Sequence, residues 1–154
     1  MLRSICRLVR AGSGAVAVLA GITSAGAVAQ EVPATSEIDW SLLPYASTED
    51  GVTLSDGRKI GMVCMGEGSP TVLLTLGNGG WGIAWSKVQP AVAAVTRVCT
   101  WDRAGLGFSS ASQLPQTADN TPSDLEAALA AGGIDGPYIV VGWSSGAFES
   151  LLLK

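Results

Sequence analysis

The sequence contains no histidine among its 154 residues. A Ser-His or Cys-His catalytic pair, an HExxH zinc site and a histidine-held haem each require an imidazole, so these residues alone complete none of them. Three cysteines are present, which is too few for a disulfide scaffold, and they lack the CxxC spacing of a zinc site. The sequence therefore predicts no metal site and no cofactor.

Charged residues are also scarce, at 14% of the chain, with a formal net charge of −4. No basic stretch follows residue 10, so we expect no nucleic-acid surface. In contrast, 47% of the residues are hydrophobic and 20 are glycine. This composition excludes a disordered tail or a coiled coil, and the length fits one ordinary domain.

The N-terminal segment has the layout of a secretory signal peptide. Residues 1–10 carry three arginines and no acid, residues 11–29 are uncharged, and Ala27-Val28-Ala29 forms an A-x-A cleavage signal. We expect cleavage before Gln30 and a secreted or periplasmic protein with no stable membrane anchor. An uncleaved membrane anchor and a buried helix are the alternatives, since the run is just long enough to span a bilayer.

After the signal peptide (1–29), we predict an N-terminal arm over 30–48 and a partial domain over 49–154. The arm has no clear hydrophobic period. Its four large apolar side chains either dock it on the domain or are merely exposed: Trp40, Leu42, Leu43 and Tyr45. The domain starts with a predicted hairpin over 51–64, because Asp56-Gly57 favours a tight turn between two alternating runs.

Apolar runs typical of buried strands then alternate with helical stretches. Strands are predicted at 71–76, 96–101 and 138–141, and helices at 85–95, 121–131 and after residue 145. Pro90 favours a helix start near Gln89 or a kink, and Thr121 is the expected cap of the second helix. This alternation predicts an α/β fold, with a mostly parallel sheet, an N-terminal hairpin and helices on both faces.

The most informative motif is G-x-S-x-G at Gly142–Gly146, between an apolar strand and a helical stretch. This setting is typical of a nucleophile elbow, a strained turn that exposes the central serine, Ser144. Gly142 and Gly146 are the elbow glycines, since side chains at those positions would collide. The alternative is an ordinary serine in a glycine-rich turn.

A second glycine-rich segment, Leu76–Gly80, follows the strand at 71–76. Acyl transfer requires donors for the oxygen that becomes negative, and glycines let a backbone approach a substrate closely. We therefore expect an oxyanion hole formed by the backbone N–H groups of Asn78 and Ser145. A plain turn at the end of a strand is the alternative.

On these motifs, about residues 50–154 resemble the N-terminal part of an α/β-hydrolase, a family of serine esterases, lipases and peptidases. The resemblance rests on GSPTVLLTLGNGG, VQPAVAAVTRVCTWDRAGLGFS and YIVVGWSSG. Asp102 and Arg103 are interpreted as residues that brace a loop. Where the family frequently has His-Gly, this sequence has Leu76-Gly77.

The resemblance implies acyl hydrolysis of a small ester or amide through Ser144. The family's histidine and acid lie well beyond the nucleophile, whereas this sequence stops at Lys154, so we expect an incomplete chain that is inactive alone. A serine at the elbow argues against the relatives that place Asp there, the haloalkane dehalogenases and epoxide hydrolases. The alternative function is a non-catalytic secreted binding domain with the same fold.

The resemblance also suggests a disulfide. In the family's sheet the second strand lies beside the fourth, which would bring Cys64 and Cys99 onto neighbouring strands. In an oxidising compartment such a pair bridges when its Cα atoms are close. Two buried free thiols are the alternative.

Overall fold

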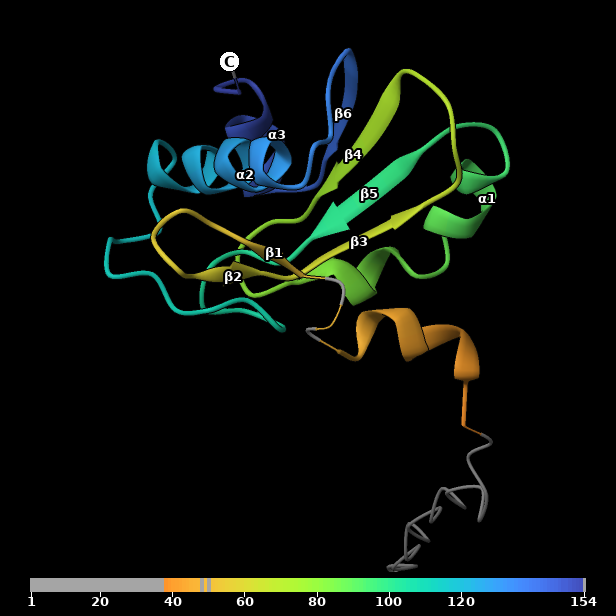
Figure 1. Cartoon of the computed structure of the whole chain (residues 1–154), viewed down its shortest axis with the longest axis horizontal. Helices are drawn as coiled ribbons and strands as arrows, with labels where there is room; N and C mark the ends of the chain where they lie inside the picture. Colours follow the sequence, from red (N-terminus) through yellow and green to blue (C-terminus); the bar gives the residue numbers. More distant parts are fainter. Residues whose placement is uncertain (1–37, 48, 50, 154) are drawn as a thin grey trace, which may run out of the picture. The chain divides into compact units, whose positions relative to one another are not determined.

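A computed structural model describes residues 38–47, 49 and 51–153. They belong to one compact unit, Glu37–Lys154, drawn in colour in Figure 1. The predicted signal peptide, 1–29, lies outside the described residues. Within the described part, no helix has the length and apolar character needed to cross a membrane.

The main sheet has four strands in the order β3-β5-β4-β6. In Figure 1, β4 lies between β5 and β6 and runs parallel to both, whereas β3 is antiparallel to β5. A separate two-stranded hairpin, β1-β2, precedes it. The strands are β1 Val52–Thr53, β2 Lys59–Ile60, β3 Met62–Met65, β4 Thr71–Thr75, β5 Val98–Trp101 and β6 Tyr138–Gly142.

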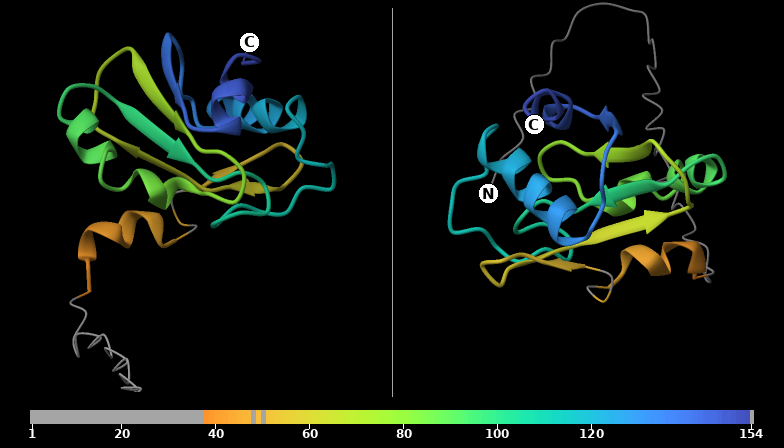
Figure 2. Two further views of the ribbon diagram at one scale, coloured as in Figure 1. Left: turned by 180° about the vertical axis from the view of Figure 1, so that it is seen from behind. Right: turned by 45° about the horizontal axis from the view of Figure 1, so that its top comes forward.

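Helices cover both faces of the sheet (Figure 2). On one face α2 packs through Leu125 and Leu129 over Leu73, while on the other Val92 of α1 packs over Val72 and Leu74. The predicted α/β fold, with a mixed, mostly parallel sheet, is therefore confirmed. The helical segments are η1 Trp40–Tyr45, η2 Gly82–Trp85, α1 Gln89–Ala93, α2 Asn120–Ala131 and α3 Ser145–Ser150.

The apolar run of β4 is explained by its central position. All five residues of Thr71–Thr75 are buried, because strands lie on both sides of β4 and helices lie on both of its faces. Successive side chains of a strand point to opposite faces, so a strand covered on both faces needs apolar residues throughout.

The start of α1 agrees with the start near Gln89 that Pro90 favours, whereas the start of α2 differs from the sequence-based expectation. The helix predicted over 85–95 begins at Gln89, with Pro90 in its first turn, where a missing N–H costs little. Thr121 is not the cap of α2, which begins one residue earlier. The hydroxyl of Thr117 instead accepts a hydrogen bond from the N–H of Asn120. A threonine in the loop before the helix therefore pairs with an N–H group that has no acceptor within the helix.

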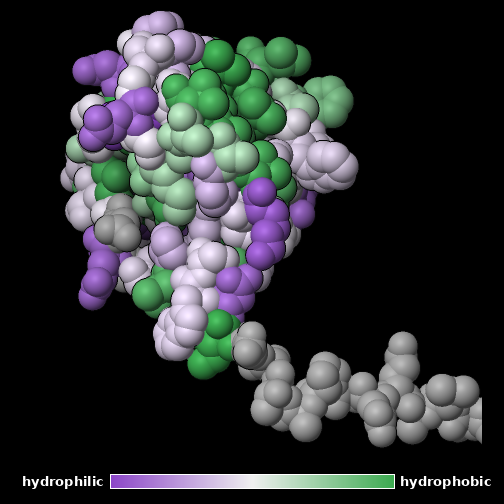
Figure 3. Space-filling model, turned by 90° about the vertical axis from the view of Figure 1, so that its right-hand side faces the viewer, coloured by the Kyte–Doolittle hydropathy of each residue, from purple (hydrophilic) through white to green (hydrophobic). Residues whose placement is uncertain are grey.

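The apolar run at 138–141 is typical of a strand that is buried on both faces, but among the described residues this strand is not buried. There β6 is an edge strand, and Ile139 is 50% exposed. Phe148 in α3 and Leu151 directly after it are exposed as well. Figure 3 shows hydrophobic side chains gathered in the upper part of the face that lies on the right of Figure 1. The strand is apolar on two faces, but the described residues cover only one.

The described part of the arm contacts the domain through buried Tyr45 and through an exposed ion pair between Asp39 and Lys87. Tyr45 is buried and its hydroxyl donates to Oε1 of Gln89 at 2.8 Å. The amide of Gln89 in turn donates to the carbonyl of Val63 at 2.7 Å. Trp40 and Leu43 remain exposed, so Tyr45 is the buried contact of η1 with the rest of the domain.

Cys64 and Cys99 are register partners on β3 and β5, and a disulfide joins them with a Cα–Cα distance of 4.1 Å. The residues are 35 apart in sequence. A cross-link of this kind restricts the unfolded chain, which lowers the entropy gained on unfolding.

We predict that reducing the bridge lowers the free energy of unfolding by about 3–4 kcal/mol, the chain-entropy value for a loop of this length. Urea unfolding with and without dithiothreitol measures the difference. The Cys64→Ala, Cys99→Ala double variant is the control, and its unfolding should not respond to the reductant. A wild-type midpoint that ignores dithiothreitol would contradict the prediction.

Candidate active site

Ser144 lies in the turn between β6 and α3, in a backbone conformation that side chains rarely adopt. Its φ is 56° and its ψ is −129°, and among the described residues it is the one non-glycine residue with positive φ. The turn is anchored on the sheet, since the N–H of Trp143 donates to the carbonyl of Thr75 at 3.0 Å. Ser144 is exposed, so the turn presents its side chain to solvent.

The two elbow glycines are required by close backbone contacts. A Cβ added at Gly142 would lie 2.4 Å from the Cα of Ala147, and one at Gly146 would lie 2.9 Å from the carbonyl oxygens of Thr75 and Leu76. Both distances are too short for a carbon in contact with backbone. The spacing G-x-S-x-G thus follows from the tightness of the turn.

The strand order brings the Leu76–Gly80 loop to the elbow. Because β4 and β6 are parallel neighbours with Thr75 opposite Gly142, the segments that follow them leave the sheet at the same edge. At Gly77 an added Cβ would lie 2.8 Å from the Cβ of Ser144. The structure therefore places this loop directly against the expected nucleophile.

The two expected oxyanion donors belong to residues that contact each other. The N–H of Asn78 donates to Oγ of Ser145 at 3.1 Å. The backbone nitrogen of Ser145 lies 3.2 Å from the Cβ position at Gly77. In this structure the hydroxyl of Ser145 therefore occupies the acceptor position in front of the Asn78 N–H.

A buried cation ties the loop to the elbow helix. Nε of Arg103 donates to the carbonyl of Leu76 at 2.9 Å, and Nη1 donates to Oε1 of Glu149 at 2.7 Å. Nη2 also bonds to the Leu76 carbonyl and pairs with Oε2 of Glu149. Arg103 is only 3% exposed and Glu149 only 8%, so water screens the pair poorly.

Sequence reasoning anticipated a bracing role for Arg103 but missed Glu149. The available signal was weak, because Glu149 is the one acid in the mostly apolar stretch AFESLLLK. A lone carboxylate among apolar residues needs a partner when it is buried. The sequence does not show which cation supplies it, since Arg103 lies 46 residues away.

Asp102 connects the start of η2 to the loop that follows β5. Its Oδ1 accepts from the N–H of Gly82 at 2.7 Å and its Oδ2 from the N–H of Phe108 at 2.8 Å. Burial raises the pKa of Asp102, and these two hydrogen bonds oppose the shift. Both carboxylate oxygens are occupied by backbone donors, which assigns Asp102 a structural role.

The described residues contain no group of three or more His, Cys, Asp or Glu side chains able to hold a metal ion. A surface hollow of about 480 Å³ is present elsewhere, and its lining does not include Ser144, Asn78 or Ser145. Ser144 and Asn78 are exposed, so the candidate site is open to solvent in the described part and is built from the two loops that follow β4 and β6.

Comparisons with known proteins agree with this geometry. A family model for the alpha/beta hydrolase fold matches residues 70–153, more than half of the chain. Among curated proteins, the uncharacterized protein YqjL of Bacillus subtilis is 32% identical over 82 residues, which cover 53% of this chain and 32% of that protein. The probable transporter efuK of Hormonema carpetanum is 37% identical over 79 residues, 50% of this chain and 11% of that protein.

Solved structures give the same result. An alpha/beta hydrolase from Sphaerobacter thermophilus is 33% identical with a TM-score of 0.57, over 66% of this chain and 38% of that one. The epoxide hydrolase CorEH is 25% identical with a TM-score of 0.59, over 66% of this chain and 35% of that one. The chain therefore spans about a third of the length of these structures, and a third or less of the curated relatives.

The buried ion pair leads to a testable stability prediction. Arg103→Leu leaves the Glu149 carboxylate buried without its cation and removes the donors to the Leu76 carbonyl. We expect the free energy of unfolding to fall by about 3–5 kcal/mol in urea titrations. The Arg103→Leu, Glu149→Leu double variant should recover part of this loss, because it removes the unpaired charge.

Lys87→Ala is the matched control, since it deletes an ion pair with Asp39 in which both side chains are well exposed. Its stability should be nearly unchanged. If the single Arg103→Leu variant is as stable as the double variant, the ion pair does not have the role assigned to it.

Proposed function

The chain belongs to the alpha/beta hydrolase fold family, and on that premise we propose that it carries the nucleophile and the oxyanion hole of a serine hydrolase acting on esters or amides. The observation that supports this most directly is the strained conformation of Ser144, with φ of 56°, directly against the Gly77 backbone. Strain of this kind persists where the surrounding structure enforces it, and it is concentrated at functional sites.

In the proposed reaction, Oγ of Ser144 attacks the carbonyl carbon of the substrate while its proton passes to a general base. The carbonyl oxygen becomes an oxyanion that accepts hydrogen bonds from the N–H groups of Asn78 and Ser145. Collapse expels the alcohol or amine, which takes up the proton, and leaves an acyl group on Ser144. Water then loses a proton to the base as it attacks the acyl carbonyl carbon, and a second oxyanion forms. Its collapse breaks the bond to Oγ of Ser144, which takes back the proton as the acid is released.

The oxyanion site as proposed requires one local rearrangement. The hydroxyl of Ser145 now accepts from the Asn78 N–H at 3.1 Å, which is the position a substrate oxygen would take. Rotation of this side chain about its Cα–Cβ bond frees the donor. Until then the hydroxyl satisfies the N–H, so the site does not hold an unpaired donor.

The general base is not available within this sequence, because the 154 residues contain no histidine. The complete activity therefore requires a base contributed from outside these residues. The missing histidine favours a second candidate function, a binding domain that uses the same loops without chemistry. The two candidates differ in whether Ser144 reacts with an electrophile when a base is supplied.

We also propose export of the protein, on the basis of the arginines, apolar run and Ala27-Val28-Ala29 signal of residues 1–29. The exported chain should begin at Gln30 by intact-mass analysis. A membrane-bound product that retains Met1 would contradict this proposal.

A fluorophosphonate probe with added imidazole tests the proposed nucleophile on this chain. Without imidazole we expect no labelling, because an unassisted serine hydroxyl is a weak nucleophile at neutral pH. With imidazole, the labelling rate of Ser144 should be at least roughly tenfold higher than the rate measured without imidazole. This gain is below the ~10²–10⁴ of a positioned base, because imidazole is free in solution.

Ser144→Ala is the control and should abolish the imidazole-dependent labelling. A longer polypeptide that supplies its own histidine should be labelled at Ser144 without imidazole. Labelling of the Ser144→Ala variant at the wild-type rate, or peptide mapping of the label to Ser145, would contradict the proposed nucleophile. An unreactive Ser144 under all these conditions would favour the binding domain.

A further inference from the structure

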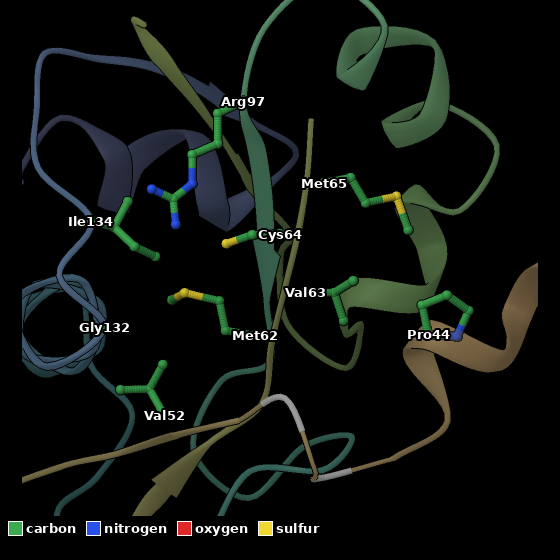
Figure 4. A pocket seen from close by; sticks show the side chains of 9 residues that line it. All are labelled: Pro44, Val52, Met62, Val63, Cys64, Met65, Arg97, Gly132 and Ile134. Carbon is green, nitrogen blue, oxygen red and sulfur yellow. The ribbon is translucent and has the colours of Figure 1, made fainter. Parts of the chain in front are cut away.

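A groove of about 480 Å³ runs beside β3, and none of the residues of the proposed hydrolase site lines it. Its lining residues come from η1, β1, β3, the segment after α2 and the residue before β5 (Figure 4). We infer that this groove is a binding site for an alkyl carboxylate, with the alkyl chain on Met62, Ile134 and Val52 and the carboxylate on Arg97.

The apolar end of the groove is continuous with the hydrophobic core. Met62 and Ile134 belong to the core cluster on the α2 face, and Val52 packs against that cluster. Figure 4 shows the side chains of Met62 and Ile134 lying between Arg97 and Val52. Met62 and Ile134 are each 4% exposed and Val52 is partly buried, so an alkyl chain in the groove would lie against the exposed edges of these side chains and lose water there.

The charged end of the groove is a cation without a counterion. Among the described residues, no hydrogen bond or ion pair involves the guanidinium of Arg97, whereas Arg58, Lys87 and Arg103 each pair with a carboxylate. Arg97 is half-buried, and its guanidinium points into the groove beside Cys64 (Figure 4). A half-buried, unpaired guanidinium gains from a carboxylate that matches its fork of donors.

Glu67 is an acidic residue near Arg97. Both residues line an adjoining hollow of about 370 Å³, but their charged groups form no ion pair. The negative charge of Glu67 opposes anion binding without neutralising Arg97. The separation of a cation at one end from apolar side chains at the other fits an amphiphile with a single anionic head, and the volume lies within the range of small-molecule sites.

Equilibrium dialysis with isotopically labelled octanoate and octanol tests this inference on the full chain. The two probes share one alkyl chain and differ only in the head group. Octanoate should bind about tenfold more tightly than octanol, as expected for a charge-assisted hydrogen bond. Arg97→Gln should remove this preference, and Arg97→Lys should retain part of it.

Two further variants separate the groove from the proposed hydrolase site. Glu67→Gln should tighten octanoate binding and leave octanol binding unchanged. Ser144→Ala should affect neither probe, so failure of the proposed hydrolase function would not alter this result. Circular dichroism of the Arg97 variants checks that the fold is retained.

Equal affinities for octanoate and octanol, or an Arg97→Gln variant that keeps the preference, would overturn the inference. The absence of octanoate binding would overturn it as well. If an uncharged, extended valine peptide then bound in the place of octanoate, the groove would instead be a site where a strand adds to the open edge of β3.

Discussion

The candidate site depends on one backbone constraint, the tight turn that holds Ser144 at positive φ between β6 and α3. A non-glycine residue in this region costs on the order of 1–3 kcal/mol, so the turn persists only if its surroundings fix it. They do so through backbone contacts. Ala147 lies against Gly142, and the carbonyls of Thr75 and Leu76 lie against Gly146, at distances that leave no room for a Cβ.

The position of the turn follows from the sheet, and its link to the Leu76–Gly80 loop follows from Arg103. Because β4 and β6 are parallel neighbours, both segments emerge at the same edge. Arg103 then holds the Leu76 carbonyl and the Glu149 carboxylate together in a buried position. A shift of either segment would break hydrogen bonds to a charge that water cannot reach, which makes the relative position of the two segments stiff.

The sequence predicts the fold class and the main site motif, because both depend on local signals. The apolar run at 71–76 and the alternation after it indicate a parallel sheet, and G-x-S-x-G after a strand indicates the turn. The remaining features depend on contacts between distant residues. No local signature shows that Glu149 pairs with Arg103. Nor does one show that Thr117, and not Thr121, accepts the hydrogen bond from the first N–H of α2. The exposure of β6 depends on which strands flank it, which its apolar composition does not reveal.

The most direct test of this account compares the unfolding free energies of the Ser144→Gly and Ser144→Ala variants in urea. Both variants lack the hydroxyl, but alanine keeps the Cβ that makes positive φ costly, whereas glycine does not. We predict that the measured free energy of unfolding is about 1 kcal/mol higher for the glycine variant than for the alanine variant. This is a net difference, in which the relief of backbone strain exceeds the greater entropy that glycine gains on unfolding. A glycine variant as stable as the alanine variant, or less stable, would contradict the claim that the turn at Ser144 is strained.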